Sequence, residues 1–308
     1  MKKIVITGAT GMIGNALLHE CISNGVMVLA IVRPNSKNIC RILDSPLVRI
    51  VECDLAELDR LDESIVGTDW DVFYHFGWNN ASLTCRNDVV YQSLNIGYTI
   101  QAIKLAQKLG CKKFVGAGSQ AEYGVLNTNI ISPNSPTNPN TAYGIAKYTS
   151  GKMAGLWASQ NGLDCLWTRI FSVFGAYDLS TTMISSSIRK MLKGERMQFT
   201  KGIQLWDYLY SSDAGHAFYL IGEDASGNKV YCLGSGQAKP LHEYIEIIHD
   251  IIDPNLEIGI GEIPYGNGEI LNLCADIKSL QEDTGFVPKV NFETGISEVI
   301  SYMKKFNR

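Results

Sequence analysis

The sequence predicts an α/β fold with a doubly wound parallel sheet that is covered by helices on both faces. Two observations lead to this prediction. Short apolar runs alternate with stretches of helical periodicity through the first half of the chain, and a glycine-rich turn joins the first run to the first helical stretch. This alternation is typical of βαβ units. The 308 residues, 45% of them apolar, can bury a large core in one large domain or two closely packed ones.

Six strands and three helices account for most of the first half. Each expected strand is a short apolar run, and each expected helix is longer and repeats its apolar residues at helical spacing. The strands are expected at Lys3–Thr7, Met27–Val32, Val48–Glu52, Val72–His75, Lys113–Ala117 and Leu163–Phe171, and the helices at Met12–Asn24, Val89–Leu109 and Ala142–Asn161.

The alternation is less regular in the second half. Helices are expected at Leu179–Gly194, Asp213–Gly222, Leu241–Ile252 and Glu293–Phe306, and a short strand at Leu205–Tyr210. Asp213 is expected to cap its helix, because an aspartate at that position accepts hydrogen bonds from the first N–H groups. We therefore expect a first domain over residues 1–174, with a returning segment near 213–235. A smaller mixed α/β domain is expected over most of 175–308.

Charge and composition exclude several classes of protein. The net charge is −4 and no basic block occurs, which argues against a nucleic-acid partner. No apolar stretch approaches the length of a membrane span, and the apolar run after Lys3 is too short for a signal peptide. The eight cysteines are scattered, with no Cys-x-x-Cys pair. We expect a cytoplasmic protein without a membrane segment or a disulfide framework.

A strand followed by Gly8, Gly11 and Gly14 lies at the beginning of the sequence. Glycines at this spacing let the backbone turn tightly and approach a pyrophosphate, whose charge is favoured at the N-terminus of a helix. The strand–turn–helix context separates this motif from a chance glycine triplet. The turn therefore predicts a dinucleotide cofactor in a Rossmann-type domain.

The end of the second strand indicates which dinucleotide is bound. Sites that prefer NAD place an Asp or Glu near this point to bind the ribose hydroxyls. Val32 occupies the expected position of that acid, and Arg33 follows it. Because an arginine can bind a phosphate through two parallel hydrogen bonds, we predict a preference for NADPH.

Tyr143 and Lys147 form a Tyr-x-x-x-Lys pair, and Ser119 lies 24 residues before the tyrosine. Residues four apart share one face of a helix, so the ammonium can lie beside the phenol. A nearby cation favours the phenolate and is expected to lower the pKa of the tyrosine. Such a tyrosine can exchange a proton with a sugar oxygen while a hydride moves at the attached carbon.

These motifs together resemble the extended short-chain dehydrogenase/reductase family, which includes nucleotide-sugar epimerases, dehydratases and reductases. The resemblance covers nearly the whole chain and implies a catalytic triad of Ser119, Tyr143 and Lys147. The cofactor-binding residues that it implies, with the Arg33 argued above, are Thr7, Gly8, Thr10, Gly11, Met12, Ile13, Gly14, Arg33, Asp54, Leu55, Phe76, Gly77, Trp78, Asn95, Tyr143, Lys147 and Phe171. For the substrate it implies Ser119, Gln120, Tyr143, Ser172 and Trp206.

Two of the implied substrate residues depart from the family pattern. Ser172 stands where the family has asparagine, and Trp206 stands where it has an arginine that often helps to hold the diphosphate. Dehydratases of the family carry Asp-Glu directly after the serine or threonine. Here those places hold Gln120 and Ala121, which cannot act as acid or base, so dehydration is not expected.

The predicted function is NADPH-dependent reduction of the C4 keto group of a nucleotide-linked 4-keto-6-deoxyhexose, with a CDP- or dTDP-sugar favoured. Such reductions supply deoxysugars for bacterial surface polysaccharides. A nucleotide-sugar 4-epimerase that uses NAD is the alternative, and a non-catalytic NADPH-sensing protein is a further one. Glu122 is open to two interpretations, a catalytic acid or a residue that packs behind the site.

The resemblance also implies a homodimer through the helices that carry Asn95 and Tyr143. No metal site is expected. His242, Glu246 and His249 share a helical face, but the pattern lacks the second histidine of a zinc-binding helix and is more typical of a solvated face.

Overall fold

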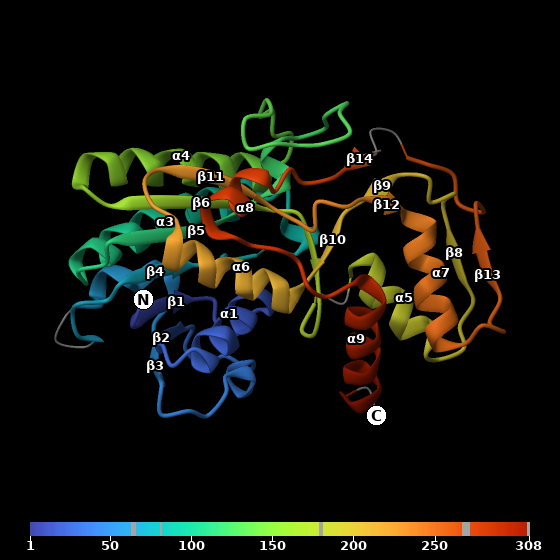
Figure 1. Cartoon of the computed structure of the whole chain (residues 1–308), viewed down its shortest axis with the longest axis horizontal. Coiled ribbons are helices and arrows are strands. Elements are labelled where there is room, and N and C mark those ends of the chain that lie inside the picture. Colours follow the sequence, from blue (N-terminus) through green and yellow to red (C-terminus); the bar gives the residue numbers. More distant parts are fainter. Residues whose placement is uncertain (63–65, 81, 179–180, 267–271, 307–308) are drawn as a thin grey trace.

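The computed structural model describes residues 1–62, 66–80, 82–178, 181–266 and 272–306 (Figure 1). Its main layer is a seven-stranded sheet with the order β11-β6-β5-β4-β1-β2-β3. Every neighbouring pair in this sheet is parallel. The predicted Rossmann-type α/β fold is confirmed.

The strands of this sheet lie close to their predicted positions. They are β1 (Lys3–Thr7), β2 (Met27–Val32), β3 (Val48–Glu52), β4 (Val72–His75), β5 (Lys113–Ser119), β6 (Asp164–Ile170) and β11 (Lys229–Leu233). β5 runs on to Ser119 instead of ending at Ala117, so the predicted catalytic serine is the last residue of a central strand. β6 ends at Ile170, and β11 was not predicted.

Two pairs of helices cover the two faces of the sheet (Figure 1). α1 (Met12–Ser23) and α6 (Ser211–Asp224) share one apolar core with the sheet, and α3 (Val89–Lys108) and α4 (Ala142–Asn161) share the other. The second core includes the small residues Ala102, Ala106, Ala154 and Ala158. Small side chains allow α3 and α4 to approach the strands closely, which brings Tyr143 and Lys147 on α4 near the end of β5.

The strand order reverses between β1 and β4. From β1 the chain continues through β2 and β3 on one side, and it then returns to β4 on the other side. Connections leave in opposite directions at such a point, which opens a crevice at the carboxyl ends of the strands. Gly8 follows β1 at this point, and Phe76 follows β4.

The second half of the chain builds a separate core beside the sheet. The helices α5 (Met183–Met191), α7 (Leu241–Ile252) and α9 (Phe292–Phe306) share this core with the parallel pair β7 (Ser172–Phe174) and β10 (Tyr208–Tyr210). The other short elements are β8 (Met197–Phe199), β9 (Leu205–Trp206), β12 (Lys239–Pro240), β13 (Ile258–Ile260), β14 (Asn272–Leu273), α8 (Lys278–Thr284) and the 3₁₀ turns η1 (Ile39–Arg41), η2 (Leu55–Arg60), η3 (Leu83–Cys85) and η4 (Gln120–Glu122).

The predicted strand Leu205–Tyr210 is two strands in the structure. β9 pairs with β12 and β14, whereas β10 pairs with β7. Between them, the fully buried Asp207 accepts hydrogen bonds from the backbone N–H groups of Ser235, Gly236 and Ala275 and from the Ser235 hydroxyl. This carboxylate fixes the change of direction, and a pattern of alternating apolar residues does not contain that information.

Two helix predictions also need correction. α6 begins at Ser211, so Asp213 is inside its first turn and does not cap it. The Asp213 carboxylate accepts from the N–H groups of Lys289 and Val290 instead, which ties the segment before α9 to α6. The helix expected at Leu179–Gly194 spans Met183–Met191, and residues 179 and 180 lie outside the described part.

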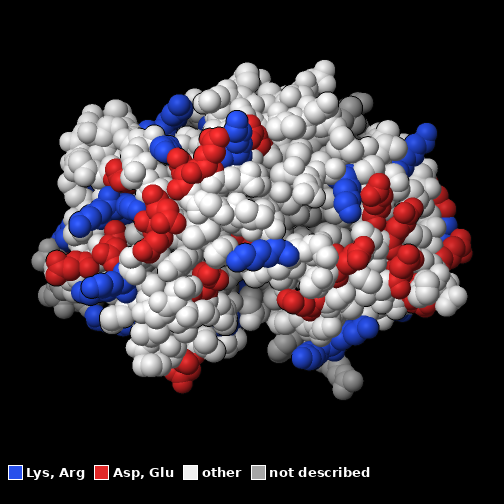
Figure 2. All heavy atoms as spheres, in the orientation of Figure 1, with Lys and Arg blue, Asp and Glu red and all other residues white. Residues whose placement is uncertain are grey.

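No helix among the described residues is long and apolar enough to cross a membrane. On the face shown in Figure 2, acidic and basic side chains are interspersed and form no continuous basic surface.

Candidate functional site

A cavity of about 450 Å³ lies at the carboxyl ends of the central strands. Its walls come from the glycine turn, the ends of β4, β5 and β6, and the first turns of α4. The lining residues include Gly8, Gly11, Met12, Ile13, Gly14, Phe76, Trp78, Ser119, Tyr143, Lys147 and Phe171. The structure therefore brings the predicted triad and much of the predicted cofactor set to one cavity.

The glycine turn has the geometry that a dinucleotide requires. Gly8 has a φ of +78°, and a Cβ at this position would lie 2.8 Å from the backbone of Phe76 and Gly77. A Cβ on Gly14 would overlap the carbonyl of Gly8. Gly11 precedes α1 without a side-chain cap, so the first N–H groups of this helix remain available for a phosphate. These residues fit the pyrophosphate of a nicotinamide cofactor.

A second, smaller cavity of about 150 Å³ continues from the first, and both share Gly8, Asn38 and Trp78. Seven of the predicted cofactor residues line it: the shared Gly8 and Trp78, together with Thr10, Arg33, Asp54, Leu55 and Gly77. Asp54 also caps η2 by accepting from the N–H of Ala56. Together the two cavities run along the strand ends from Tyr143 to Arg33.

Arg41 contributes a cation to the larger cavity that sequence motifs did not reveal. Its guanidinium donates to the carbonyl of Thr10 and stacks 4.4 Å from the centre of the Tyr177 ring. Both side chains line the cavity. A positive charge next to the start of α1 adds to the attraction for a pyrophosphate. Arg41 lies in η1 and belongs to no recognisable motif.

Ser119 ends β5 and starts the turn η4. Its hydroxyl accepts from the N–H of Ala121, and its own N–H donates to Oε1 of Glu122 at 2.9 Å. Glu122 therefore holds the backbone of the serine from behind, and the side chain of Ser119 lines the cavity.

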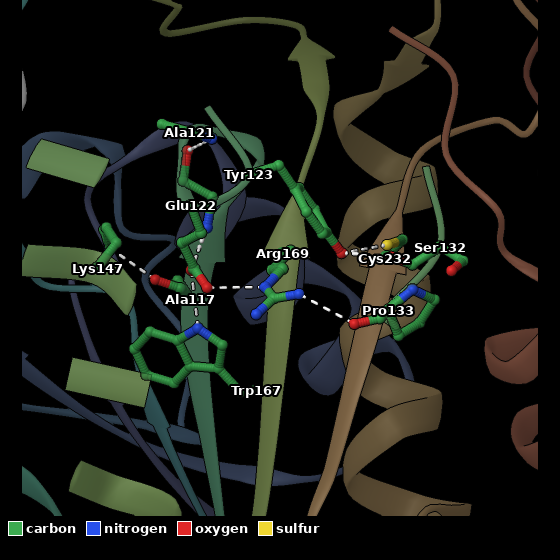
Figure 3. Close-up of polar contacts among 11 residues, drawn as sticks. Ala117, Ala121, Glu122, Tyr123, Ser132, Pro133, Lys147, Trp167, Arg169 and Cys232 are labelled. Carbon is green, nitrogen blue, oxygen red and sulfur yellow. Dashed lines mark hydrogen bonds and ion pairs between the residues drawn. The ribbon is translucent and has the colours of Figure 1, made fainter. Parts of the chain in front are cut away.

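Glu122 is almost completely buried and accepts three hydrogen bonds (Figure 3). Besides the Ser119 N–H, it accepts from the indole of Trp167 at 2.9 Å and from Nε of Arg169 at 2.8 Å. It does not line the cavity. Of its two sequence interpretations, the structure favours packing behind the site over a role as catalytic acid.

Trp167 occupies a space that three glycines leave open. A Cβ on Gly116 or Gly118 of β5, or on Gly151 of α4, would overlap the indole. The ring therefore lies between β5 and α4 and sets the distance between the strand that ends at Ser119 and the helix that carries Tyr143.

Arg169 continues the network toward the loop before α4. Its guanidinium donates to the carbonyl of Pro133 at 3.1 Å and lies 4.5 Å from the centre of the Tyr123 ring (Figure 3). One buried ion pair thus connects the serine of the predicted triad to the loop that leads into the helix of the tyrosine.

Tyr143 lies in the first turn of α4, and its phenol lies beside the Ser119 side chain. Burial raises the pKa of its phenol, whereas the Ser119 side chain and the charge of Arg86 act in the opposite direction. Glu122 adds to the increase. The pKa of Tyr143 is therefore raised, whereas the sequence predicted that it would be lowered, because burial outweighs the favourable contacts.

Lys147 lies one turn further along α4 and is 4% exposed. Its ammonium donates to the carbonyl of Ala117 at 2.6 Å and lies 3.7 Å from the centre of the Trp78 ring. It is 5.8 Å from the centre of the Tyr143 ring. Burial lowers the pKa of Lys147 to about 7, although the carboxylate of Glu122 opposes the decrease.

Two predicted cofactor residues support the cavity from behind. Asn95 is buried, exchanges two hydrogen bonds with the backbone of Asn79 and also donates to the carbonyl of Tyr91. Thr7 is buried against His75, and its hydroxyl accepts from the N–H of Gly77. Neither residue is among those that line the two cavities.

The two departures from the family pattern contact each other. The indole of Trp206 donates to the hydroxyl of Ser172 at 2.8 Å. Neither residue lines the two cavities described above, and neither does Gln120. In the sequence Ser172 and Trp206 are two separate departures from the family pattern, but in the structure they form one hydrogen-bonded pair. Among the described residues, no group of acidic, histidine and cysteine side chains could hold a metal ion.

Comparison with known proteins identifies relatives over the whole length of the chain. The model of the NAD dependent epimerase/dehydratase family matches residues 4–234. A putative UDP-glucose 4-epimerase of Methanocaldococcus jannaschii is 30% identical, with 99% of each chain covered.

Solved structures share the fold. UDP-glucose 4-epimerase of Thermotoga maritima, determined with UDP-glucose, has a TM-score of 0.87 at 21% identity and covers 99% of this chain and 100% of its own. The dTDP-glucose 4,6-dehydratase of Streptomyces venezuelae, determined with NAD, has a TM-score of 0.86 at 19% identity. The match covers 99% of this chain and 98% of that chain.

The buried Lys147 makes stability depend on pH. Its pKa in the folded protein lies below that in the unfolded chain, so the unfolded chain binds the extra proton between the two values. Stability therefore rises with pH in this window. From about pH 7 to about pH 9, the unfolding free energy of the cofactor-free wild type should rise by about 2 kcal/mol relative to Lys147→Met.

Urea denaturation at several pH values measures this difference. Lys278→Met, which removes an exposed lysine, should follow the wild type. If the unfolding free energies of the wild type and Lys147→Met change with pH in parallel, the pKa of Lys147 is not lowered in the folded protein.

Proposed function

The chain belongs to the NAD-dependent epimerase/dehydratase family, and we propose that it inverts the C4 hydroxyl of a nucleotide-diphosphate hexose. One observation carries the proposal: Ser119 and Tyr143 lie together in the wall of the cavity that begins at the glycine turn. The pair lies where a sugar carbon could meet a nicotinamide ring. The similarity to a putative UDP-glucose 4-epimerase supports a UDP-hexose as the first substrate to test.

In the proposed reaction, the C4 hydroxyl of the sugar lies against Ser119 and Tyr143. Tyr143 takes the hydroxyl proton as the carbon is oxidised and returns it when the carbon is reduced from the other face. Ser119 donates to the C4 oxygen in both steps. A nicotinamide bound in the cavity supplies the hydride chemistry at C4.

Lys147 has a supporting role in this proposal. Its ammonium would hold the nicotinamide ribose, as the resemblance implies, and its pKa near 7 lets it take part in proton exchange close to neutral pH. Residues 1–174 and the returning segment near 213–235 would bind the cofactor, and residues 175–308 would supply most of the contacts to the nucleotide sugar.

Dehydration is not part of the proposal, although some relatives are dehydratases. Removal of water from the sugar needs an acid and a base next to Ser119. Gln120 and Ala121 supply neither, and the nearest carboxylate, Glu122, is buried behind the strand and paired with Arg169.

A second candidate is the NADPH-dependent reduction of a nucleotide-linked 4-keto-6-deoxyhexose, with a CDP- or dTDP-sugar favoured. The smaller cavity, where the adenosine end of the cofactor would lie, favours this reaction. Val32 is buried there, and the exposed Arg33 lines the cavity with Ser36 and Asn38. A guanidinium and a hydroxyl are suited to a 2′-phosphate, and an enzyme that consumes NADPH releases its cofactor after each turnover.

The phenol of Tyr143 is the first group to test. Tyr143→Phe removes the proton acceptor and keeps the ring, so turnover should fall by about 10²–10⁴-fold. NMR follows the interconversion of UDP-glucose and UDP-galactose, and NADPH oxidation follows CDP- and dTDP-linked 4-keto sugars. Near-full turnover of the variant on either class would refute the proposed role. Cofactor binding by the wild type without turnover on any sugar would favour a sensor.

Arg33 tests the second candidate, which needs a preference for NADPH over NADH. Arg33→Ala is expected to weaken NADP⁺ binding by about 10-fold or more, because a hydrogen-bonded charge pair is worth roughly 1.5–3 kcal/mol. Binding of NAD⁺ should be unchanged, which makes it the internal control. Calorimetric titration with both cofactors measures the difference. NAD⁺ binding by the wild type that equals or exceeds NADP⁺ binding would contradict the preference and favour the epimerase.

We further propose that the enzyme is a homodimer through α3 and α4. These adjacent helices expose a row of apolar side chains: Val89, Val90, Tyr91 and Leu94 on α3, and Ile145, Met153 and Leu156 on α4. A second copy can cover this face symmetrically, since each chain offers the same pair of helices.

Leu156→Glu should convert the dimer to a monomer, because it places a charge on this apolar face. Size-exclusion chromatography with light scattering measures the mass. Ile203→Glu is the matched control, since Ile203 is 60% exposed and Leu156 is 61% exposed. A wild type that is monomeric at all concentrations, or a dimeric Leu156→Glu, would exclude this interface.

A further inference from the structure

Arg86 is the charged residue closest to Tyr143 that no sequence motif identifies. It lies between η3 and α3, and its guanidinium carbon is 5.0 Å from the centre of the Tyr143 ring. Its carbonyl accepts from the N–H of Tyr143 at 2.9 Å, and the neighbouring Asn87 accepts from the N–H of Ala142. This segment is therefore fixed to the first turn of α4 by its backbone as well as by the stacked side chain.

We propose that Arg86 acts through Tyr143, where its permanent positive charge stabilises the phenolate that accepts the sugar proton. This inference rests on the proposed function, since it assigns a role in the same proton transfer. Arg86 is not among the residues that line the cavity, and it is therefore a positioning residue that reaches the substrate only through the tyrosine.

The surroundings of Tyr143 explain why a permanent cation is needed there. Burial disfavours the phenolate, and the carboxylate of Glu122, in the turn η4, does so as well. Lys147, on the same helix, is a weak counter-charge because burial lowers its pKa to about 7 and its ammonium is committed to the Ala117 carbonyl and the Trp78 ring. A guanidinium keeps its charge at all relevant pH values.

The hydrogen bonds of Arg86 support the same conclusion. Its Nε is buried and has no hydrogen-bond partner in the structure. An arginine with a purely structural task usually has its buried donors paired. Here the planar group lies over an aromatic ring, where its charge acts on the π-system.

The pH dependence of turnover and the titration of the phenol test this role. Arg86→Gln should move the ionisation of Tyr143 to higher pH, and near neutral pH the oxidation of the sugar should slow by roughly 10-fold. Arg86→Lys keeps the charge and should restore most of the shift. Ultraviolet difference spectra of each protein against its Tyr143→Phe counterpart report the phenolate directly, without any turnover.

Arg60→Gln is the control, because it removes the same charge from an exposed arginine that pairs with Glu57. Its titration and pH profile should match those of the wild type. A Tyr143 titration that is identical in the wild type and Arg86→Gln would overturn the proposal, even if the enzyme proves active on sugars. If no sugar is turned over but the titration moves as expected, the role of Arg86 stands and the proposed reaction fails.

Discussion

The packing of one indole between a strand and a helix is the constraint on which the rest of the site depends. Trp167 fills the space that Gly116, Gly118 and Gly151 leave between β5 and α4. The ring sets how far α4 stands from the sheet, and its N–H orients the carboxylate of Glu122. Glu122 in turn holds the backbone of Ser119. The packing of Trp167 between β5 and α4 therefore controls the distance between Ser119 and Tyr143. Larger residues at the three glycines would push the serine and the tyrosine apart before any substrate binds.

Burial is the second theme, and it makes the ionisation of this site different from that of an exposed Tyr-x-x-x-Lys helix. Burial raises the pKa of Tyr143 and lowers that of Lys147, so both groups are biased toward their neutral forms. His75, enclosed between Thr7 and Thr99, is affected in the same way, and its pKa falls to about 3. The site therefore relies on guanidinium groups, which stay charged where burial neutralises a lysine or a histidine. Arg86, Arg41 and the paired Arg169 are the guanidinium groups that surround it.

Much of the fold could be predicted from the sequence, because the spacing of apolar residues and the residues typical of turns determine the helices and strands locally. The strands from β1 to β4 have the bounds that their apolar runs indicate, and the glycine turn lies where its strand–turn–helix context places it. Long-range polar contacts could not be predicted this way. Asp207 divides Leu205–Tyr210 between two sheets, and Asp213 binds a distant backbone segment instead of capping its helix. In the site, the motifs identified Ser119, Tyr143 and Lys147, whereas Arg41 and Arg86 come from irregular segments that carry no periodic signal.

In our proposal, the cavity in front of Tyr143 is where C4 of a nucleotide-linked hexose is oxidised or reduced. The most direct measurement is the near-ultraviolet absorbance of the reduced nicotinamide in a single turnover, with enzyme in excess of cofactor. We expect a transient rise that decays when enzyme loaded with oxidised cofactor meets a UDP-hexose, because an epimerase returns the hydride to the sugar, or a lasting fall when enzyme loaded with NADPH meets a 4-keto sugar nucleotide. Unchanged absorbance in both experiments together with no altered sugar in the NMR spectrum, with the cofactor shown to be bound, would contradict oxidation or reduction at C4.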